Sequence, residues 1–170
     1  MHLAPTAGVG LGGHLDGISA YPEGPTWHLV TYGLTELWAK ESPDPEWSGW
    51  GYEFTLRVPD LDGSPPSWAY KLLHAVAGVT QQGTVFGPGH RLAAGGPLTG
   101  SEDTLLSAVA FTLDPDLATI TTPNGRVDFL MLVGVTPKEV EEMKASSTLD
   151  VLDRLRQENP RLVTDPRRAT

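Results

Sequence analysis

The stretch RVDFLMLVGV, Arg126 to Val135, places narrow limits on the fold because it is apolar almost throughout. A run of this length is too short to cross a bilayer, and it lacks the alternation of a strand with one wet face. It therefore predicts a strand that is buried on both faces in the centre of a sheet. The stretch Gly51 to Val58 does alternate, with Glu53, Thr55 and Arg57 between apolar residues, and predicts a strand with one face exposed to water.

Two further segments have the character of strands. Residues Trp27 to Tyr32 combine β-branched and aromatic residues, and LLSAVAFTL, Leu105 to Leu113, is another apolar run. The sequence changes character at Gly33, and we expect a turn of helix to start at Thr35. The tetrapeptide TPNG, 122 to 125, is typical of a turn.

Three segments carry helix signals. From Ser67 to Val79 the apolar residues recur at helical spacing, with Ser67 expected as the N-cap. Thr136 is followed by a proline and then a glutamate in the order of a capped helix start, so a helix should run to about Ala145. Another should begin near Thr148, with leucines spaced three apart on one side. Strands that occur together with three short helices predict an α+β domain rather than a regular βαβ series.

The length of 170 residues fits one domain. Residues 1–26 are rich in glycine and proline without a lasting period, so we expect a lead-in with little regular structure. The single domain is expected at 27–165, with a C-terminal tail at 166–170. Between Thr80 and Glu102 lies a glycine-rich loop that is too long for a passive connector, which makes it a candidate binding loop.

Composition excludes several classes of protein. Cysteine is absent, which excludes disulfides, thiolate metal sites and a cysteine nucleophile. The net charge of −9 opposes nucleic acid binding and favours a cationic protein partner, although the charge would also serve solubility alone. No apolar run is long enough to span a membrane, and the first basic residue is Lys40, so no secretory signal is expected. We expect a cytoplasmic protein that binds no membrane.

No residue pattern is typical of a metal or catalytic site. The five histidines include no pair at the i, i+4 spacing that places two imidazoles on one helical face. The glycine-rich windows lack the context of a phosphate-binding loop, and the motif Gly-x-Ser-x-Gly is absent. We therefore expect no metal, no cofactor and no catalytic residue. One alternative stays open, an enzyme of unrecognised type with His90 and either Asp103 or Asp128 as its acid and base.

Several blocks of the sequence together resemble the suppressor-of-fused (SUFU) domain family. In chain order they are WHLVTYGLTELW, GWGYEFTLRV, PPSWAYKLL, FGPGH, TPNGRVDFLMLVGVTPKE and LVTDPRR, and they extend from about Asp16 to Arg168. The resemblance implies an α+β fold with a central, mostly antiparallel or mixed sheet flanked by helices. It also implies a protein-binding module without catalysis. In animals such a domain is the N-terminal half of a protein that clamps a short peptide, partly by strand addition.

This chain resembles the stand-alone bacterial form of the family, whose members are thought to be immunity proteins that neutralise toxins. The partner is then another protein or peptide, such as a cationic toxin, and the chain a monomer or weak homodimer. The partner site implied by the resemblance comprises Gly78, Phe86, Gly89, His90 and Arg91. Animal members carry a tyrosine at the position of Gly78 and an aspartate between the residues that match Gly89 and His90. This chain is therefore not expected to bind the animal peptide.

The aromatic residues are concentrated in one half, because all tryptophans and tyrosines lie between Tyr21 and Tyr70. We expect them to support the sheet, and the loop from Gly83 to Gly100 with the adjacent sheet edge to bind the partner. Around the Gly33 turn, the residues expected to enter the core are Trp27, Tyr32, Leu34, Leu37 and Trp38. Glu53 and Arg57 would each need a partner if their sheet face were covered. The remaining alternative is a structural homo-oligomer, built on an exposed aromatic patch.

Overall fold

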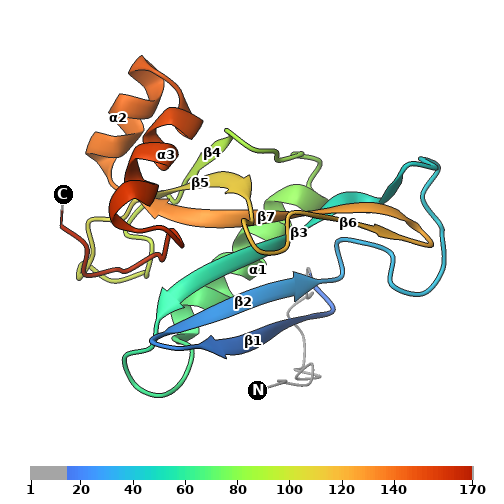
Figure 1. Ribbon diagram of the computed structural model, residues 1–170, viewed down its shortest axis with the longest axis horizontal. Coiled ribbons are helices and arrows are strands. Elements are labelled where there is room, and N and C mark those ends of the chain that lie inside the picture. The colour runs from blue at the N-terminus through green and yellow to red at the C-terminus, as the bar shows by residue number, and fades with distance from the viewer. Residues whose placement is uncertain (1–14, 170) are drawn as a thin grey trace.

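The computed structural model describes residues 15–169, which form one mixed sheet of seven strands with three helices (Figure 1). The expected α+β class is confirmed. The strands are β1 (Gly17–Glu23), β2 (Thr26–Tyr32), β3 (Trp47–Pro59), β4 (Arg91–Ala93), β5 (Ala108–Leu113), β6 (Thr119–Thr122) and β7 (Gly125–Val135). The helices are α1 (Ser67–Gln81), α2 (Pro137–Ala145) and α3 (Thr148–Glu158).

Strand β7 occupies the centre of the sheet, as its continuous apolar sequence predicts. The strand order is β1-β2-β3-β7-β5-β4, and β6 pairs with the first residues of β7. The β3–β7 pair is parallel, and the other pairs are antiparallel. Leu130 and Leu132 of β7 pack into the core on one face of the sheet, and Met131 and Val133 pack into the core on the other. Both faces of the strand are therefore buried.

The helices cover the two faces of the sheet unequally. Figure 1 shows α1 behind the sheet, and α2 and α3 at the end formed by β5 and β7. Leu73 of α1 belongs to the larger core, and Met143 of α2 and Leu152 of α3 belong to the smaller one. No described helix lies over β1 and β2 on the side opposite α1, which leaves that part of the sheet open. None of the helices within residues 15–169 is long and apolar enough to span a membrane.

The start of α2 follows the sequence prediction, and that of α1 does not. The hydroxyl of Thr136 accepts the N–H of Glu139 at 3.3 Å, and the Glu139 carboxylate accepts the N–H of Thr136 at 2.8 Å. These two hydrogen bonds form a capping box. The N-cap expectation for α1 was wrong, because Ser67 is the first helical residue and the cap position is Pro66, which offers no side-chain acceptor.

Three strands were not expected from the sequence. Strand β1 lies inside the lead-in that was expected to have little regular structure, and it pairs with β2 along its whole length. Residues 1–14 of that lead-in lie outside the described residues. Strand β4 lies inside the glycine-rich loop, and β6 precedes the TPNG turn. Because each of these strands is short or rich in small residues, long-range pairing decides its conformation.

The chain leaves β2 through a turn built around the Glu53 carboxylate. Oε1 of Glu53 accepts the backbone N–H groups of Gly33, Leu34 and Thr35 at 2.9 to 3.0 Å. The expected turn of helix at Thr35 was wrong, because these N–H groups point at a carboxylate rather than along a helix axis. Gly33 has a φ of +117°, a conformation that L side chains rarely adopt.

The apolar residues around this turn divide between core and surface. Trp27 and Leu34 are buried, as expected, and Tyr32 is partly buried. The expectation was wrong for Leu37 and Trp38, whose exposed fractions are 50% and 93%. Without a helix after Gly33, the segment that carries these two residues has no apolar face to turn toward the sheet.

We expect Gly33→Ala to lower the free energy of unfolding by about 2 kcal/mol or more, since strained backbone conformations typically cost 1 to 3 kcal/mol. The added Cβ would also lie 2.4 Å from the backbone nitrogen of Asp16. The matched control is Gly96→Ala, where nothing lies within 4 Å of the new Cβ. Urea unfolding should show a change within about 0.5 kcal/mol for the control. Equal effects of the two variants would contradict the prediction.

Candidate partner-binding edge

Strand β4 forms an open edge of the sheet. In the described chain it pairs only with β5. On that side, the N–H of Phe111 donates to the carbonyl of His90 at 3.0 Å, and the N–H of Ala94 donates to the carbonyl of Ser107 at 2.9 Å. Since antiparallel hydrogen bonds alternate along a strand, the backbone groups of Arg91 and Ala93 face away from β5. These residues therefore offer N–H and C=O groups to an additional strand.

An apolar groove runs beside this edge, between α1 and β4. Its volume is about 350 Å³. Trp68, Leu72 and Val79 of α1 form one wall, and Leu92 of β4 and the buried Leu98 line the other. Lys71 is the one charged side chain in the lining. The groove can therefore take apolar side chains from a segment that pairs with β4.

The segment that leads into β4 is fixed by the core. The ring of Phe86 stacks on the ring of Phe111 with centroids 4.5 Å apart. The backbone N–H of Phe86 donates to the hydroxyl of Tyr52 at 3.3 Å. Gly89 has a φ of +88°, and its N–H donates to the carbonyl of Phe111 at 2.8 Å. Nδ1 of His90 accepts the N–H of Gly87 at 3.1 Å. The edge strand is therefore held in place before any partner binds.

The structure brings four of the five residues of the expected partner site together. Phe86 and Gly89 support the backbone from within, whereas His90 and Arg91 are exposed. A guanidinium nitrogen of Arg91 donates to the hydroxyl of Thr148 at 3.0 Å, which connects the edge to α3. Gly78 is buried in the last turns of α1, and its carbonyl accepts the N–H of the residue that follows the helix.

Sequence reasoning missed the strand character of residues 91–93 and the groove beside them. The signal was short, because Leu92 is the one large apolar residue of Arg91–Ala93. The two residues beside it face the opposite side of the sheet. Three residues within a glycine-rich loop do not predict a strand without knowledge of its partner. The groove wall could have been suspected from the larger apolar residues in this part of the loop, Leu92 and Leu98.

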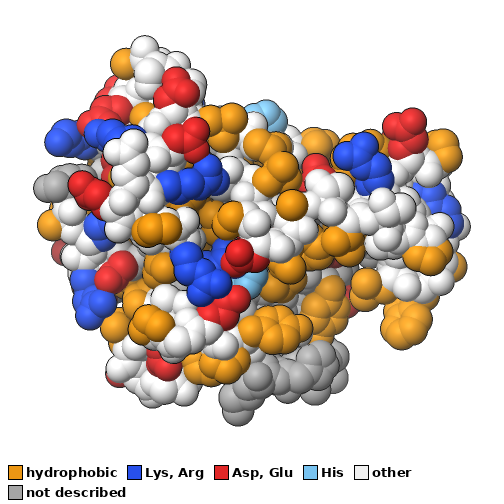
Figure 2. All heavy atoms as spheres, viewed as in Figure 1, with side chains coloured by type: hydrophobic (Ala, Val, Ile, Leu, Met, Phe, Trp, Pro, Cys, Tyr) orange, Lys and Arg blue, Asp and Glu red, His pale blue; other side chains and the backbone are white. Residues whose placement is uncertain are grey.

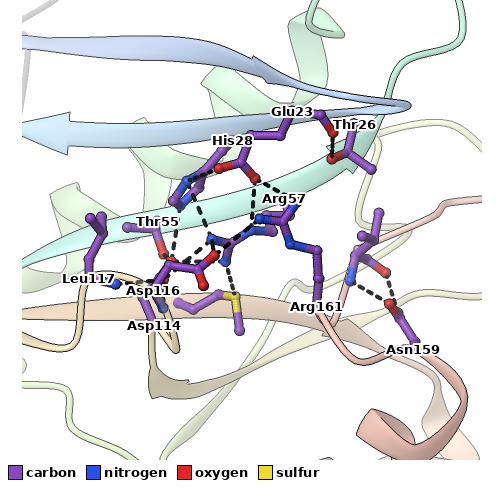
Figure 3. A network of polar contacts seen from close by, with 12 residues as sticks. Glu23, Thr26, His28, Thr55, Arg57, Asp114, Asp116, Leu117, Asn159 and Arg161 are labelled. Atoms are coloured by element: carbon purple, nitrogen blue, oxygen red, sulfur yellow. Dashed lines mark hydrogen bonds and ion pairs between the residues drawn. The ribbon is translucent and has the colours of Figure 1, made fainter.

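A buried polar network anchors the far end of β5, the strand on which β4 depends (Figure 3). The Arg57 guanidinium on β3 is 0% exposed and donates to Asp114, directly after β5, at 3.0 Å. Nε2 of His28 on β2 lies 3.0 Å from the same carboxylate oxygen, and the hydroxyl of Thr55 donates to it at 2.7 Å. The network therefore joins β2 and β3 to the end of β5.

Further carboxylates complete the surroundings of Arg57. Asp116 accepts from it at 2.6 Å and Glu23 at 3.3 Å, and both also pair with Arg161 (Figure 3). Arg57 has the charged partners that its burial was expected to require, whereas Glu53 has hydrogen-bond donors but no cation beside it in the described chain. Since the described contacts satisfy Arg57 and Asp114 from several strands, we assign the network a structural role.

The pKa of the Asp114 carboxyl reflects this environment. Desolvation raises the pKa of this buried group, but the hydrogen bonds from His28 and Thr55, that from the N–H of Asp116, and the charge of Arg57 outweigh it. The net result is a pKa well below the usual value of an aspartate. Asp114 is therefore ionised in the folded protein at neutral pH.

The residues of the enzyme alternative have separate partners. Asp103 accepts hydrogen bonds from Thr99 and Ser101, and Asp128 accepts one from Thr119. His90 contacts the backbone of its own loop. No hydrogen bond or ion pair joins the histidine to either carboxylate, so these groups form no hydrogen-bonded acid–base pair in the described chain. Within residues 15–169, no group of three or more His, Asp or Glu side chains is arranged to hold a metal ion.

The fold and the edge define this chain as an α+β domain with a mixed sheet, two helix-covered cores and an open, pre-formed strand edge at β4. A family model described as "Suppressor of fused protein (SUFU)" matches residues 12–169. The chain belongs to the suppressor-of-fused family, which confirms the resemblance seen in the sequence.

Two curated relatives share this part of the sequence. The Suppressor of fused homologs of Homo sapiens and Mus musculus are each 31% identical over an alignment of 156 residues, and the match covers 84% of this chain. The match covers 32% of either relative, so the chain spans about a third of their length. The activities and partners of those longer proteins therefore enter only as proposals below.

Solved structures show the same fold. A chain from the crystal structure of the Sufu–Fu complex has a TM-score of 0.81 at 29% identity, covering 94% of this chain and 79% of its own length. Drosophila Suppressor of Fused has a TM-score of 0.80 at 28% identity, covering 93% of this chain and 43% of its own. A SUFU homolog from Neisseria gonorrhoeae, at 18% identity, has a TM-score of 0.62 and covers 92% and 79%. This last likeness concerns the fold alone.

Proposed function

We propose that this domain is a non-catalytic protein-binding module that takes an extended segment of a partner along the open edge of β4. The observation that carries the proposal is the outward direction of the backbone groups of Arg91 and Ala93. Strand addition at such an edge supplies affinity through main-chain hydrogen bonds, and neighbouring pockets supply specificity through alternate side chains. A neighbour solved as a complex with Fu supports binding to a protein.

The groove between α1 and β4 defines what the partner segment should contain. Because Leu92 faces the α1 core and the groove lining is mostly apolar, every second residue of the segment should be apolar. The intervening side chains would face the side of Arg91, toward α3. An alternating segment of about four to six residues fits an edge strand of this kind.

We expect Ala93→Pro to weaken binding of a partner peptide at least tenfold. Proline removes the N–H that faces the open edge, while the hydrogen bonds to β5 are made by the flanking residues. The peptide would be selected from a displayed random library, and its dissociation constant would be measured by fluorescence anisotropy.

The matched control is Thr121→Pro on β6, another edge strand. The N–H of Phe129 donates to the carbonyl of Ala118, so the alternation turns the N–H of Thr121 away from β7 as well. This variant should bind the peptide with unchanged affinity. A folded Ala93→Pro variant that binds as tightly as the parent would refute strand addition at β4.

We infer further that the natural partner is a basic protein and that the domain is a cytoplasmic immunity protein of the bacterial type. The net charge of −9 supports a basic partner, because long-range attraction speeds the encounter. In a growth assay with a secreted basic protein encoded by a neighbouring gene, the chain should restore growth and Ala93→Pro should not. Growth inhibition that persists with the parent chain would dismiss the immunity role and leave strand addition to be judged by the peptide.

A further inference from the structure

Three carboxylates are buried in the described chain, and they differ in how their charge is compensated. Asp114 is paired with Arg57, and Glu139 with Arg168. Glu53 is 3% exposed, yet no lysine, arginine or histidine of residues 15–169 forms an ion pair with it. A buried charge without an opposite charge is unusual enough to require an explanation.

The hydrogen bonds of Glu53 show that its ionised form suits the site and that one oxygen keeps acceptor capacity. Oε1 accepts the three backbone N–H groups of the turn and the hydroxyl of Thr35. Oε2 accepts the hydroxyl of Thr31 at 2.7 Å. Thr31 is the donor in this bond, because an ionised carboxylate only accepts, and its oxygen in turn accepts the N–H of Phe54 at 2.8 Å. A carboxylate oxygen has two lone pairs, so Oε2 has room for another donor.

Desolvation acts against the charge of this carboxylate. Burial raises the pKa of Glu53, and the hydrogen bonds from Thr31, Thr35 and Gly33 only partly oppose the effect. A cation next to Oε2 would compensate the lost hydration. The described chain does not supply one.

Glu53 lines a pocket of about 390 Å³ on the sheet face that no described helix covers. Tyr21, Tyr32, Trp38 and Phe129 supply aromatic rings to its lining. The lining contains no lysine, arginine or histidine. Figure 2 shows hydrophobic side chains gathered on this face, between the β1–β2 hairpin and the β6–β7 hairpin. Aromatic walls beside a carboxylate are the surroundings that organic cations prefer.

The rim of the pocket exposes large apolar side chains to solvent. Trp38 is 93% exposed, Tyr21 52% and Ile120 43%. Lys40, the nearby cation, is paired with Glu36 at 3.2 Å and therefore belongs to the rim loop rather than to Glu53. A second copy of this chain would present the same lining, with two carboxylates and no cation, to itself. Charge complementarity thus favours a basic partner over self-association.

We propose that this pocket binds the guanidinium or ammonium group of a basic side chain presented by a partner polypeptide. The aliphatic stem of an arginine or lysine would pack against the aromatic walls, and its charged end would donate to Glu53 Oε2. The pocket and the β4 edge are separate surfaces, since no residue lines both the pocket and the groove. The inference therefore adds a second contact and does not depend on strand addition.

The test is a titration of the intact chain with small probes, and two-dimensional NMR monitors each step of it. The probes are N-acetyl-arginine amide and N-acetyl-lysine amide, with N-acetyl-norleucine amide as the neutral counterpart of similar length. We expect either cation to shift the backbone amides of Gly33, Leu34 and Thr35 and the indole N–H of Trp38. The neutral probe should leave these resonances in place at the same concentration. Comparison of the two cations tells whether a fork-shaped or a compact group fits better.

Two variants and a control make the assignment specific. Glu53→Gln should weaken binding of the cation at least tenfold, because the charge next to Oε2 is lost. Trp38→Ala should weaken it about two- to fivefold, the usual worth of an exposed cation–π contact. Trp38 is so exposed that its removal leaves the fold intact, which keeps the test valid even if Glu53→Gln is unstable. Trp50→Ala, an exposed aromatic outside the lining, should have no effect.

Three results would overturn the proposal. The first is equal shifts with the neutral and charged probes, which would make the pocket merely apolar. The second is unchanged cation binding by both Glu53→Gln and Trp38→Ala. The third is concentration-dependent self-association that Trp38→Ala abolishes, since it would show that a second copy covers this face.

Discussion

Arg57→Met is expected to lower the free energy of unfolding by about 3 to 5 kcal/mol, as measured by urea denaturation. Removal of one partner of a buried ion pair leaves the other as an uncompensated buried charge. Here the side chains of both Arg57 and Asp114 are 0% exposed, so loss of the guanidinium leaves the Asp114 carboxylate buried without its cation and near the like charges of Glu23 and Asp116. The loss would then be larger than the net worth of the pair itself.

The control for this effect is an ion pair at the surface. Lys144 is paired with Glu141 on α2, and both side chains are more than half exposed. Lys144→Met should change the free energy of unfolding by less than about 0.5 kcal/mol. In an Asp114→Asn background, Arg57→Met should also be less damaging than in the parent. An Arg57→Met effect that matches the surface control, or that is unchanged in that background, would refute the role assigned to the network.

Stability should fall steeply as the pH is lowered from about 5 toward 2. The folded-state pKa values of Asp114 and Glu139 lie below their ordinary values. For Asp114, hydrogen bonds from His28, Thr55 and the N–H of Asp116 and the charge of Arg57 outweigh desolvation, and for Glu139 the hydrogen bond and charge of Arg168 and the hydrogen bonds from Thr136 do so. The unfolded chain binds protons on these groups first, so their contribution is complete above an unfolded-state pKa of about 4 and is lost below it. Each unit of difference in pKa is worth about 1.4 kcal/mol.

Glu53 acts in the opposite direction. Its folded-state pKa is raised, so its protonation favours the folded state as the pH falls and its ionisation disfavours that state as the pH rises. Urea midpoints at pH 3, 4, 5 and 7 measure the balance. Asp114→Asn should be less stable at pH 7 and should show a flatter decline toward acid. If the stability of Asp114→Asn fell as steeply toward acid as that of the parent, groups other than Asp114 would be responsible for the acid sensitivity.

The parts of the fold that the sequence predicted are those with local signals. The alternation of Gly51 to Val58 and the apolar run of Arg126 to Val135 identified β3 and β7, and the position of the latter in the sheet followed from its composition. The expectation that one face of β3 would be exposed to water was wrong, because Glu53, Thr55 and Arg57 are buried among partners from distant segments. The capping box at Thr136 also formed as predicted, since it involves groups three residues apart. In each case, the residues that determine the conformation are neighbours in the chain.

The parts that were missed depend on distant residues. Strand β1 exists because β2 pairs with it, and β4 because β5 pairs with it, so their own glycines, alanines and prolines were misleading. Glu53 was expected to need a partner, but that partner is the backbone of the turn about twenty residues earlier. The surface position of Trp38 followed from that turn, so it too was beyond local reasoning.

The sequence indicated the loop that contains the open edge but not the groove beside it. His90 and Arg91 lie at the open edge, in the glycine-rich loop that the sequence marked for binding. The groove wall contributed by α1 was missed, because sequence spacing does not reveal which helix faces a loop. The same holds for the aromatic pocket, whose lining comes from residues as far apart as Ser19 and Phe129.

The parallel pairing of β3 with β7 has a consequence for biosynthesis. β3 ends at residue 59 and β7 begins at residue 125, so β3 is synthesised well before its parallel neighbour. Until then β3 is paired with β2 on one side only and presents its other edge, and contacts at this sequence separation form slowly. We therefore expect the sheet to be completed only after β7 has left the ribosome, with chaperone protection of the β1–β3 meander before that point.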